Sequence, residues 1–394
     1  MSVEIAQPRG RFALINGRIV LPQAVVADKA LVIEDGKILG VAEVDALGSD
    51  VQRIDAGGRL ITPGLVDLHT HGALGHTFNE PTAEAFQTIT AENVRRGVTS
   101  LLATLATAPI AELCRCLEFC RQWMAEPRDG AQVVGAHLES PYISMAQRGA
   151  LDPQNVRTPD DGTPDRLLEH HDVLRIFVLA PELPGALDLV AKLARLGIVP
   201  AAGHTSAKEE QVLAAMRAGL RHVTHIWSAM SSTVREGPWR KPGLLEAALV
   251  FEGLTVEMIA DNRHLPPTLM KLAYKCIGAD RLCVISDATS GAGLPESARF
   301  RMGGMEYEVH DGVGMMFDRS CFAGSTTLVS QMVPILVEAV GIPLAEAVRM
   351  ASLTPARVIG LDDRKGSLEA GRDADIAIFD DDFTCWRTMI GGRW

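Results

Sequence analysis

Between residues 64 and 288, short apolar runs alternate with amphipathic segments of helical length. The apolar runs are rich in Val, Ile, Leu and Ala and have the length of buried strands. Most gaps between them show helical periodicity, as in TAEAFQTITAENVRRG and SAKEEQVLAAMRAG. The pattern predicts strands at 64–71, 98–104, 133–139, 174–182, 198–204, 222–228, 255–261 and 282–288.

Eight β/α units over roughly 225 residues match the size of a (β/α)8 barrel. The competing α/β architecture is a doubly wound open sheet, which usually binds ligands at a single switch point. Polar residues end nearly every predicted strand here, and no GxGxxG or Walker sequence follows one. We therefore predict a TIM-like (β/α)8 barrel. After its last strand, we expect an inserted hairpin at 299–317 and helices at 325–340 and 343–353.

The two ends of the chain alternate hydrophobic and polar residues over strand-length runs. Gly and Asp-Gly turn signals separate these runs, as in KALVIEDGKILGV near the start and SLEAGRDADIAIFD near the end. Neither end can bury a sheet face alone, so we expect both to form one small β-sandwich domain. The expected organisation is a barrel at 63–354, flanked by the two segments of the β-sandwich at 1–62 and 355–394.

The composition of the chain restricts which classes of binding partner and which cellular compartment we expect. The chain is 47 % hydrophobic, which supports a sizeable core, and its net charge of −11 argues against nucleic acid as a partner. It has neither an apolar signal core at its N-terminus nor a run of 18 apolar residues, so we expect no membrane span. Seven cysteines without a CxxC pair suggest free thiols in a reducing cytosol, and we expect a cytoplasmic protein.

Residues that can bind a metal ion end many of the predicted strands. In a (β/α)8 barrel, these strand ends open onto the face that carries the active site. His69 and His71 stand two apart on a strand and so point to the same side. Any one of these residues alone could have a structural role, but together they predict a single metal site. The expected ligands are His69, His71, Glu139, His204, His225 and Asp287.

Imidazole and carboxylate ligands suit Zn²⁺, Fe²⁺, Co²⁺ or Mn²⁺, of which we expect Zn²⁺ first. Such an ion lowers the pKa of a bound water and polarises a carbonyl, so hydrolysis of an amide C–N bond is the expected reaction. Asp287 is the candidate to take a proton from that water and pass it to the leaving amine. No lysine ends the fourth strand, so Glu139 is the only candidate to bridge two ions.

With these motifs assembled, the chain resembles the amidohydrolase superfamily, and within it the N-acetylglucosamine-6-phosphate deacetylases. The resemblance covers almost the whole length. It rests on PGLVDLHTHG, HLESPYIS, GHTSA, THIWSAM, SDAT, FAGST and SLEAGRDADIAIFD.

The resemblance implies hydrolysis of the acetamide of an N-acetylhexosamine-6-phosphate, with N-acetylglucosamine-6-phosphate expected first. It implies that Asp287 acts first as base and then as acid, that each subunit binds one or two metal ions, and that the protein is a homodimer. It also implies a phosphate contact by His264 and by an arginine, for which Arg240 and Arg235 compete, and it implies that this histidine and this arginine reach the site of a neighbouring subunit. The substrate-binding positions that it implies are Ala150, Leu151, Ser228, Ala229, Arg235, Arg240 and His264.

Three positions depart from the family pattern. Ser228 replaces an asparagine that contacts the sugar phosphate, and Leu151 replaces a histidine at the reacting end of the substrate. Arg263 adds a cation beside His264, either as a phosphate contact or as a solvated loop charge. The alternatives are therefore an N-acetylgalactosamine-6-phosphate deacetylase, an amidohydrolase acting on another N-acyl compound such as an N-acyl amino acid or a cyclic amide, and a catalytically silent scaffold.

Overall fold

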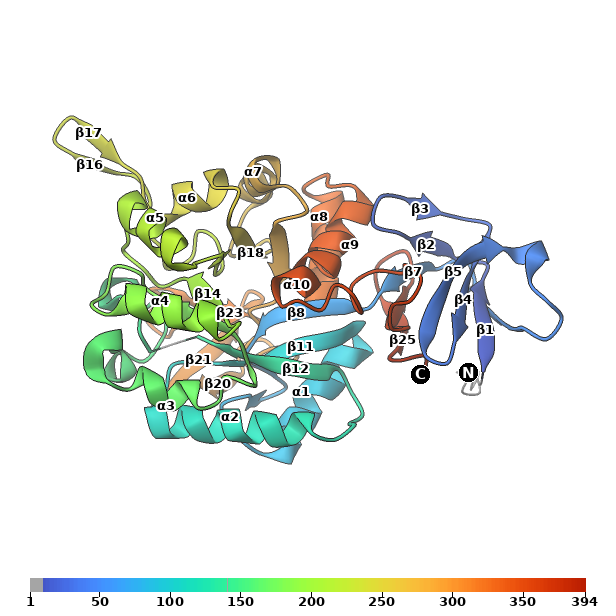
Figure 1. Ribbon diagram of the computed structural model, residues 1–394, viewed down its shortest axis with the longest axis horizontal. Helices are drawn as coiled ribbons and strands as arrows, with labels where there is room; N and C mark the ends of the chain where they lie inside the picture. The colour runs from blue at the N-terminus through green and yellow to red at the C-terminus, as the bar shows by residue number, and fades with distance from the viewer. Residues whose placement is uncertain (1–9, 140) are drawn as a thin grey trace.

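The computed structural model describes residues 10–139 and 141–394, and its centre is a parallel sheet of eight strands (Figure 1). The order of the strands in the sheet is their order in the chain. The strands are β8 (Leu65–Thr70), β11 (Val98–Leu105), β12 (Gln132–Leu138), β13 (Leu174–Leu179), β14 (Val199–Ala202), β15 (His222–Val223), β18 (Thr255–Ile259) and β19 (Leu282–Ile285).

The last strand returns to the first. The His71 backbone N–H donates to the carbonyl oxygen of Ala288 at 2.7 Å, and Thr70 forms a parallel bridge with Ala288. The predicted (β/α)8 barrel is therefore confirmed. Several strands stop two to five residues before the predicted end, because the apolar runs continue into the loops that follow them.

Helices surround the barrel and connect its strands (Figure 1). The helix α4 (Ala186–Arg195) shows why they form, since Ala186, Leu189, Val190 and Leu193 are buried at helical spacing while its other face is solvated. The other helices are α1 (Ala83–Arg95), α2 (Ile110–Met124), α3 (Pro164–Leu168), α5 (Glu209–Ala218), α6 (Leu244–Val250), α7 (Pro267–Ile277), α8 (Val329–Glu338), α9 (Leu344–Met350) and α10 (Leu353–Val358).

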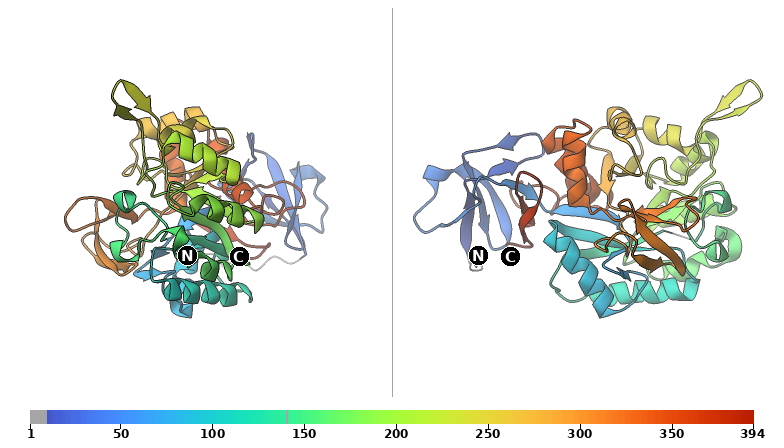
Figure 2. Two further views of the ribbon diagram at one scale, coloured as in Figure 1. Left: turned by 60° about the vertical axis from the view of Figure 1, so that its left-hand side comes forward. Right: turned by 180° about the vertical axis from the view of Figure 1, so that it is seen from behind.

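Two further sheets form the small β unit beside the barrel, and both ends of the chain contribute to it (Figures 1 and 2). The antiparallel pairing of β24 with β7 joins the two ends, with Ile378 opposite Ile61. One sheet contains β5 (Lys37–Glu43), β4 (Lys29–Glu34), β1 (Arg11–Ile15) and β6 (Gln52–Asp55). The other contains β25 (Cys385–Met389), β24 (Ile376–Phe379), β7 (Leu60–Pro63), β2 (Arg18–Val20) and β3 (Val25–Val26). The domain boundaries at 62 and 354 stay a prediction.

The insertion after β19 is larger than the expected hairpin. It is an antiparallel sheet of four strands, in the order β20 (Arg299–Met302), β21 (Met305–His310), β22 (Val313–Met315) and β23 (Phe322–Ser325). The last two strands are short and rich in glycine, so they lack the alternation that reveals a strand in a sequence. We call β20–β23 the inserted sheet.

No helix within the described residues has the length and apolar character needed to cross a membrane. All seven cysteines are free thiols.

Candidate active site

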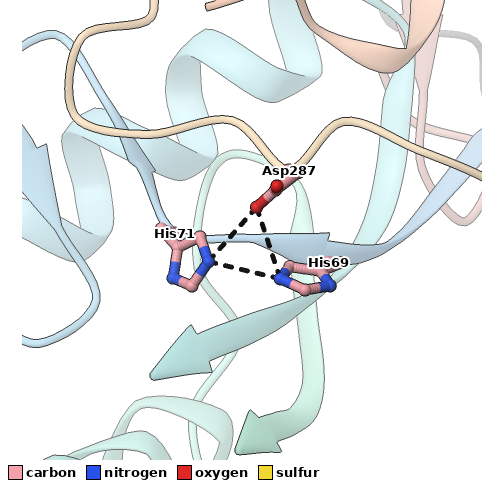
Figure 3. A group of neighbouring side chains, drawn as sticks. All are labelled: His69, His71 and Asp287. Carbon is pink, nitrogen blue, oxygen red and sulfur yellow. Dashed lines mark hydrogen bonds and ion pairs between the residues drawn. The ribbon is translucent and has the colours of Figure 1, made fainter. Parts of the chain in front are cut away.

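The six expected ligands meet at the carboxyl ends of the barrel strands, in two triads. His69, His71 and Asp287 form the first triad (Figure 3). The Nε2 atoms of its two histidines are 3.2 Å apart, and Asp287 Oδ1 lies 3.4 Å from that of His69 and 3.3 Å from that of His71. As the period-two spacing predicts, the two histidines point to the same side of the chain.

The second triad consists of Glu139, His204 and His225. Glu139 Oε1 lies 3.0 Å from Nε2 of His204 and 3.3 Å from Nε2 of His225, and those two nitrogen atoms are 3.1 Å apart. The other oxygen of Glu139 lies 3.5 Å from Nε2 of His71. Glu139 is thus the side chain that bridges the two triads.

The two triads fit divalent cations. All six residues are at most 8 % exposed, and imidazole nitrogen and carboxylate oxygen are ligands for divalent ions of the first transition row. The Nδ1 atom of His204 faces the carbonyl oxygen of Gln147 at 2.8 Å, and that of His69 faces a carboxylate at 3.1 Å. Both Nδ1 atoms are therefore placed to donate away from the site, so that a bound cation which displaces the Nε2 proton would meet an Nε2 lone pair directed into the site.

The electrostatics of the site also favour a cation. Burial alone would keep the His69 ring neutral, but the carboxylates of Asp287 and Glu257 raise the pKa of His69 to about 10. Burial likewise opposes ionisation of Glu139, yet His204 and His225 hold the pKa of its carboxyl well below the usual value. The buried carboxylates thus create a negative electrostatic potential that a bound cation would neutralise.

A layer of three further buried polar residues lies beneath the triads, and the sequence analysis missed it. It consists of Glu257, His137 and His222, all of which are 0 % exposed. Glu257 is the carboxylate that faces His69. Two features of the sequence could have indicated these residues. Glu257 interrupts an apolar strand, and His137 stands two residues before Glu139.

A pocket of about 210 Å³ opens above the triads. The structure brings five of the expected substrate-binding residues to its wall, namely Ala150, Leu151, Ser228, Ala229 and His264. The inserted sheet closes another side, with Met302 and residues 321–324 in the lining. Tyr307 fixes this sheet against the loop that carries Leu151, since its hydroxyl donates to the carbonyl oxygen of Ala150 at 2.7 Å.

His264 lies in the pocket wall of its own chain, whereas the resemblance implied that it reaches the site of a neighbouring subunit. Its Nδ1 atom lies 2.8 Å from Asp261 Oδ2, and its ring packs edge-on against Phe322. The neighbouring Arg263 is not among the residues that line the pocket. Its guanidinium donates to the carbonyl oxygen of Asp311 at 2.8 Å and pairs with the carboxylate of Asp311 at 3.2 Å. Arg263 therefore ties the loop after β18 to the inserted sheet.

Arg235 and Arg240 do not reach this pocket within their own chain. They lie opposite each other on the two strands of a hairpin, β16 (Val234–Glu236) and β17 (Trp239–Lys241), which projects from the barrel (Figures 1 and 2). Trp239 in this hairpin is 71 % exposed. We call this hairpin the arm.

Comparisons with known proteins identify the family of the chain. A family model described as the amidohydrolase family matches residues 60–394. An N-acetylglucosamine-6-phosphate deacetylase from Haemophilus influenzae is 32 % identical over 98 % of this chain and 99 % of its own length. An N-acetylgalactosamine-6-phosphate deacetylase from Escherichia coli O157:H7 is also 32 % identical, over 95 % of this chain and 97 % of its own.

Among solved structures, a point mutant of the Mycobacterium smegmatis N-acetyl-D-glucosamine-6-phosphate deacetylase, in complex with N-acetyl-D-glucosamine-6-phosphate, superposes with a TM-score of 0.90. It is 31 % identical and covers 98 % of this chain and 99 % of its own. The structure of the deacetylase from Pasteurella multocida gives a TM-score of 0.91 at 28 % identity, over 97 % and 98 % of the two chains. The chain belongs to the amidohydrolase family.

Proposed function

We propose that this protein is a metal-dependent deacetylase that hydrolyses the acetamide of an N-acetylhexosamine-6-phosphate, with N-acetylglucosamine-6-phosphate as the first candidate substrate. The observation that carries the proposal is the pair of buried triads that opens into a pocket with His264 in its wall. Relatives with this activity, aligned over nearly the whole chain, support it.

The two triads would hold one or two divalent ions, with Zn²⁺ expected first and Fe²⁺, Co²⁺ or Mn²⁺ as alternatives. When bound, such an ion supplies an acidified water and polarises the amide carbonyl. Asp287 lines the pocket and is 8 % exposed, so substrate and water can reach its carboxylate. Asp287 takes the proton of the attacking water and delivers it to the amine that leaves the acetyl group.

The rest of the pocket would bind the sugar phosphate. His264 can donate a hydrogen bond to the phosphate from Nε2, because its Nδ1 atom is engaged by Asp261. Ala150 and Leu151 on one side and Ser228 and Ala229 on the other would position the sugar.

We further propose a cytoplasmic homodimer in which the arm of one subunit reaches the pocket of the other. The arm supports this proposal because it projects from the barrel and exposes Trp239. Its two arginines, Arg235 and Arg240, would bring positive charge to the phosphate end of the partner's pocket.

N-acetylgalactosamine-6-phosphate is the second candidate substrate, because a deacetylase for that sugar is as similar to this chain as one for the gluco sugar. Another N-acyl compound is the third. It is favoured by Leu151, which lines the pocket and cannot donate a hydrogen bond to an amide carbonyl.

The test is acetate release by metal-loaded protein from four sugars, namely N-acetylglucosamine and N-acetylgalactosamine, each with and without the 6-phosphate. We expect a strong preference for one phosphate ester, which also identifies the sugar. Equal or absent activity on all four would contradict the proposal and point to a different N-acyl substrate.

A further inference from the structure

Glu257 lies in the middle of β18, below the two triads, and its carboxylate contacts one histidine from each. Its Oε2 atom is 3.1 Å from Nδ1 of His69, in the first triad. The same oxygen accepts a hydrogen bond from the backbone N–H of His225, in the second triad, at 3.3 Å. One fully buried carboxylate therefore connects the two halves of the site.

The contact between Glu257 and His69 fixes the orientation of the His69 imidazole ring. Since Nδ1 faces Glu257, Nε2 is the nitrogen that can bind a cation, and it points at His71 and Asp287 (Figure 3). His137 packs on the same ring with a centroid separation of 4.3 Å, and its own Nδ1–H donates to the carbonyl oxygen of Leu68 at 2.8 Å. The His69 ring is thus held at its edge by Glu257 and by a second imidazole beside it.

The contact between Glu257 and His225 fixes the orientation of the His225 backbone. His225 has a φ of 24°, which is rare for a residue with a side chain and has to be stabilised by its surroundings. Its N–H donates to Glu257, which helps to hold the peptide in this orientation while Nε2 of the ring faces Glu139 and His204.

Glu257 is itself held from below. Its other oxygen, Oε1, lies 3.1 Å from Nε2 of His222, and Nδ1 of His222 lies 2.6 Å from Oγ1 of Thr255. A carboxylate that is 0 % exposed costs several kcal/mol to bury without partners, and these contacts offset that cost. The arrangement uses a charged group where an apolar residue would pack at less cost, which indicates a role beyond packing.

We propose that Glu257 is a positioning residue of the metal centre, which orients His69 and His225 together and so sets the affinity of the His69–His71–Asp287 triad for a divalent cation. The inference rests on the metal centre of the proposed function and is independent of the substrate.

The test measures metal binding by Glu257→Gln and Glu257→Asp. Gln keeps the size and removes the charge, whereas Asp keeps the charge and shortens the reach, so that it cannot hold both histidines. Glu92→Gln is the matched control, because Glu92 is 5 % exposed and pairs with Arg95 and Arg96 on α1, away from both triads. The readouts are the number of Zn²⁺ ions per chain, their dissociation constants and the visible spectrum of the Co²⁺ form.

We expect the wild-type protein and Glu92→Gln to hold two ions. Both Glu257 variants should bind the ion of the first triad about 10–100-fold more weakly and show an altered Co²⁺ spectrum, the usual effect of losing a group that orients a ligand. Unchanged affinities and spectra in both variants would overturn the proposal. Normal binding in Glu257→Asp alone would also overturn it, because charge rather than positioning would then suffice.

The same data separate this inference from the proposed function. A wild-type protein that holds one ion and releases acetate would leave the deacetylase proposal standing and overturn the role of Glu257 at the first triad. If instead the wild-type protein holds two ions, the Glu257 variants lose one and no acetate is released, the role of Glu257 stands and the deacetylase proposal is overturned.

Discussion

His204, His225 and Asp287 each follow the end of a strand with a positive φ, of 48°, 24° and 47°. A conformation of this kind costs on the order of 1–3 kcal/mol per residue and persists only where the surroundings enforce it. Here it turns the three side chains inward from the loops, toward His69, His71 and Glu139. The backbone thus carries strain at three of the expected ligand positions.

Asp287→Asn tests the proposed proton transfer. The amide cannot accept and return a proton, so we expect kcat for acetate release to fall by about 10²–10⁴-fold. The matched control is Asp188→Asn, an exposed position on α4, which should leave kcat unchanged. Acetate release by Asp287→Asn at the wild-type rate, in protein with full metal content, would contradict the role of Asp287.

His264→Ala tests the phosphate contact. Hydrogen bonds to charged groups contribute about 1.5–3 kcal/mol, so the KM for a 6-phosphate substrate should rise at least tenfold. The KM for the unphosphorylated sugar should stay the same. Arg263→Ala is the comparison, and since Arg263 is engaged by Asp311 we expect it to change neither value. An equal rise in KM for both substrates in His264→Ala would argue against a phosphate contact.

The convergence of the six expected ligands could be predicted from the sequence because each is a polar residue at the end of an apolar run. Glu257 and His222 escaped this criterion because they lie inside or at the start of a strand, where a polar residue has no characteristic spacing. The sequence also did not predict that Arg235 and Arg240 lie on a projecting arm, because the direction of an exposed hairpin depends on few local contacts.

At the level of elements, the inserted sheet is joined to the barrel around Asp261. This residue follows β18 and accepts hydrogen bonds from the backbone N–H groups of Arg263 and His264, both at 2.8 Å. The hydroxyl of Ser325, at the end of β23, donates to the same carboxylate at 2.8 Å. One buried carboxylate therefore holds the loop of His264 against the edge of the inserted sheet.

This junction predicts a pH-dependent contribution to stability. Burial opposes ionisation of Asp261, but His264 and the two backbone N–H groups outweigh it and hold the pKa of the carboxyl below its usual value of 3.8. Because the folded pKa is depressed, the stabilisation is present above about pH 4 and is lost as the pH falls through the folded pKa.

We expect Asp261→Asn to lower the free energy of unfolding by about 1–3 kcal/mol at pH 7. The difference from the wild type should shrink when urea denaturation of the metal-free proteins is repeated below pH 4. Asp311→Asn, at an exposed ion pair in the same sheet, should stay within about 0.5 kcal/mol of the wild type. A deficit for Asp261→Asn that is independent of pH would contradict this explanation.

The eight barrel strands and most helices could be predicted because apolar runs and helical periodicity are local properties of the sequence. Of the inserted sheet, only a hairpin at 299–317 was predicted, because β22 and β23 are too short to show alternation. The pairing of β24 with β7 was anticipated only in outline, since neither register nor sheet order is encoded in periodicity.

At the scale of the whole molecule, the arm predicts that two subunits complete each other's sites. Mixing Asp287→Asn with Arg240→Ala subunits tests this directly. A hybrid dimer has one site with an intact Asp287 and an intact arm from its partner. We therefore expect the mixture to recover roughly a quarter of wild-type acetate release, the share of complete sites in a random population of two-fold dimers.

A second mixture, of Asp287→Asn with Arg235→Ala subunits, shows which of the two arginines acts at the partner's site. Only the arginine variant that is inactive by itself can regain acetate release in a hybrid dimer. Absence of recovery in both mixtures, with hybrid dimers present, would contradict a shared site.

We propose that the buried histidines and carboxylates hold the metal ions that carry out deacetylation. The most direct measurement is acetate release from N-acetylglucosamine-6-phosphate and its galacto isomer as a function of bound Zn²⁺, starting from chelated protein. We predict no release from metal-free protein and a rise with ion content that saturates at one or two ions per chain. Full activity in the chelated protein, or none on either substrate at saturating metal, would contradict the claim.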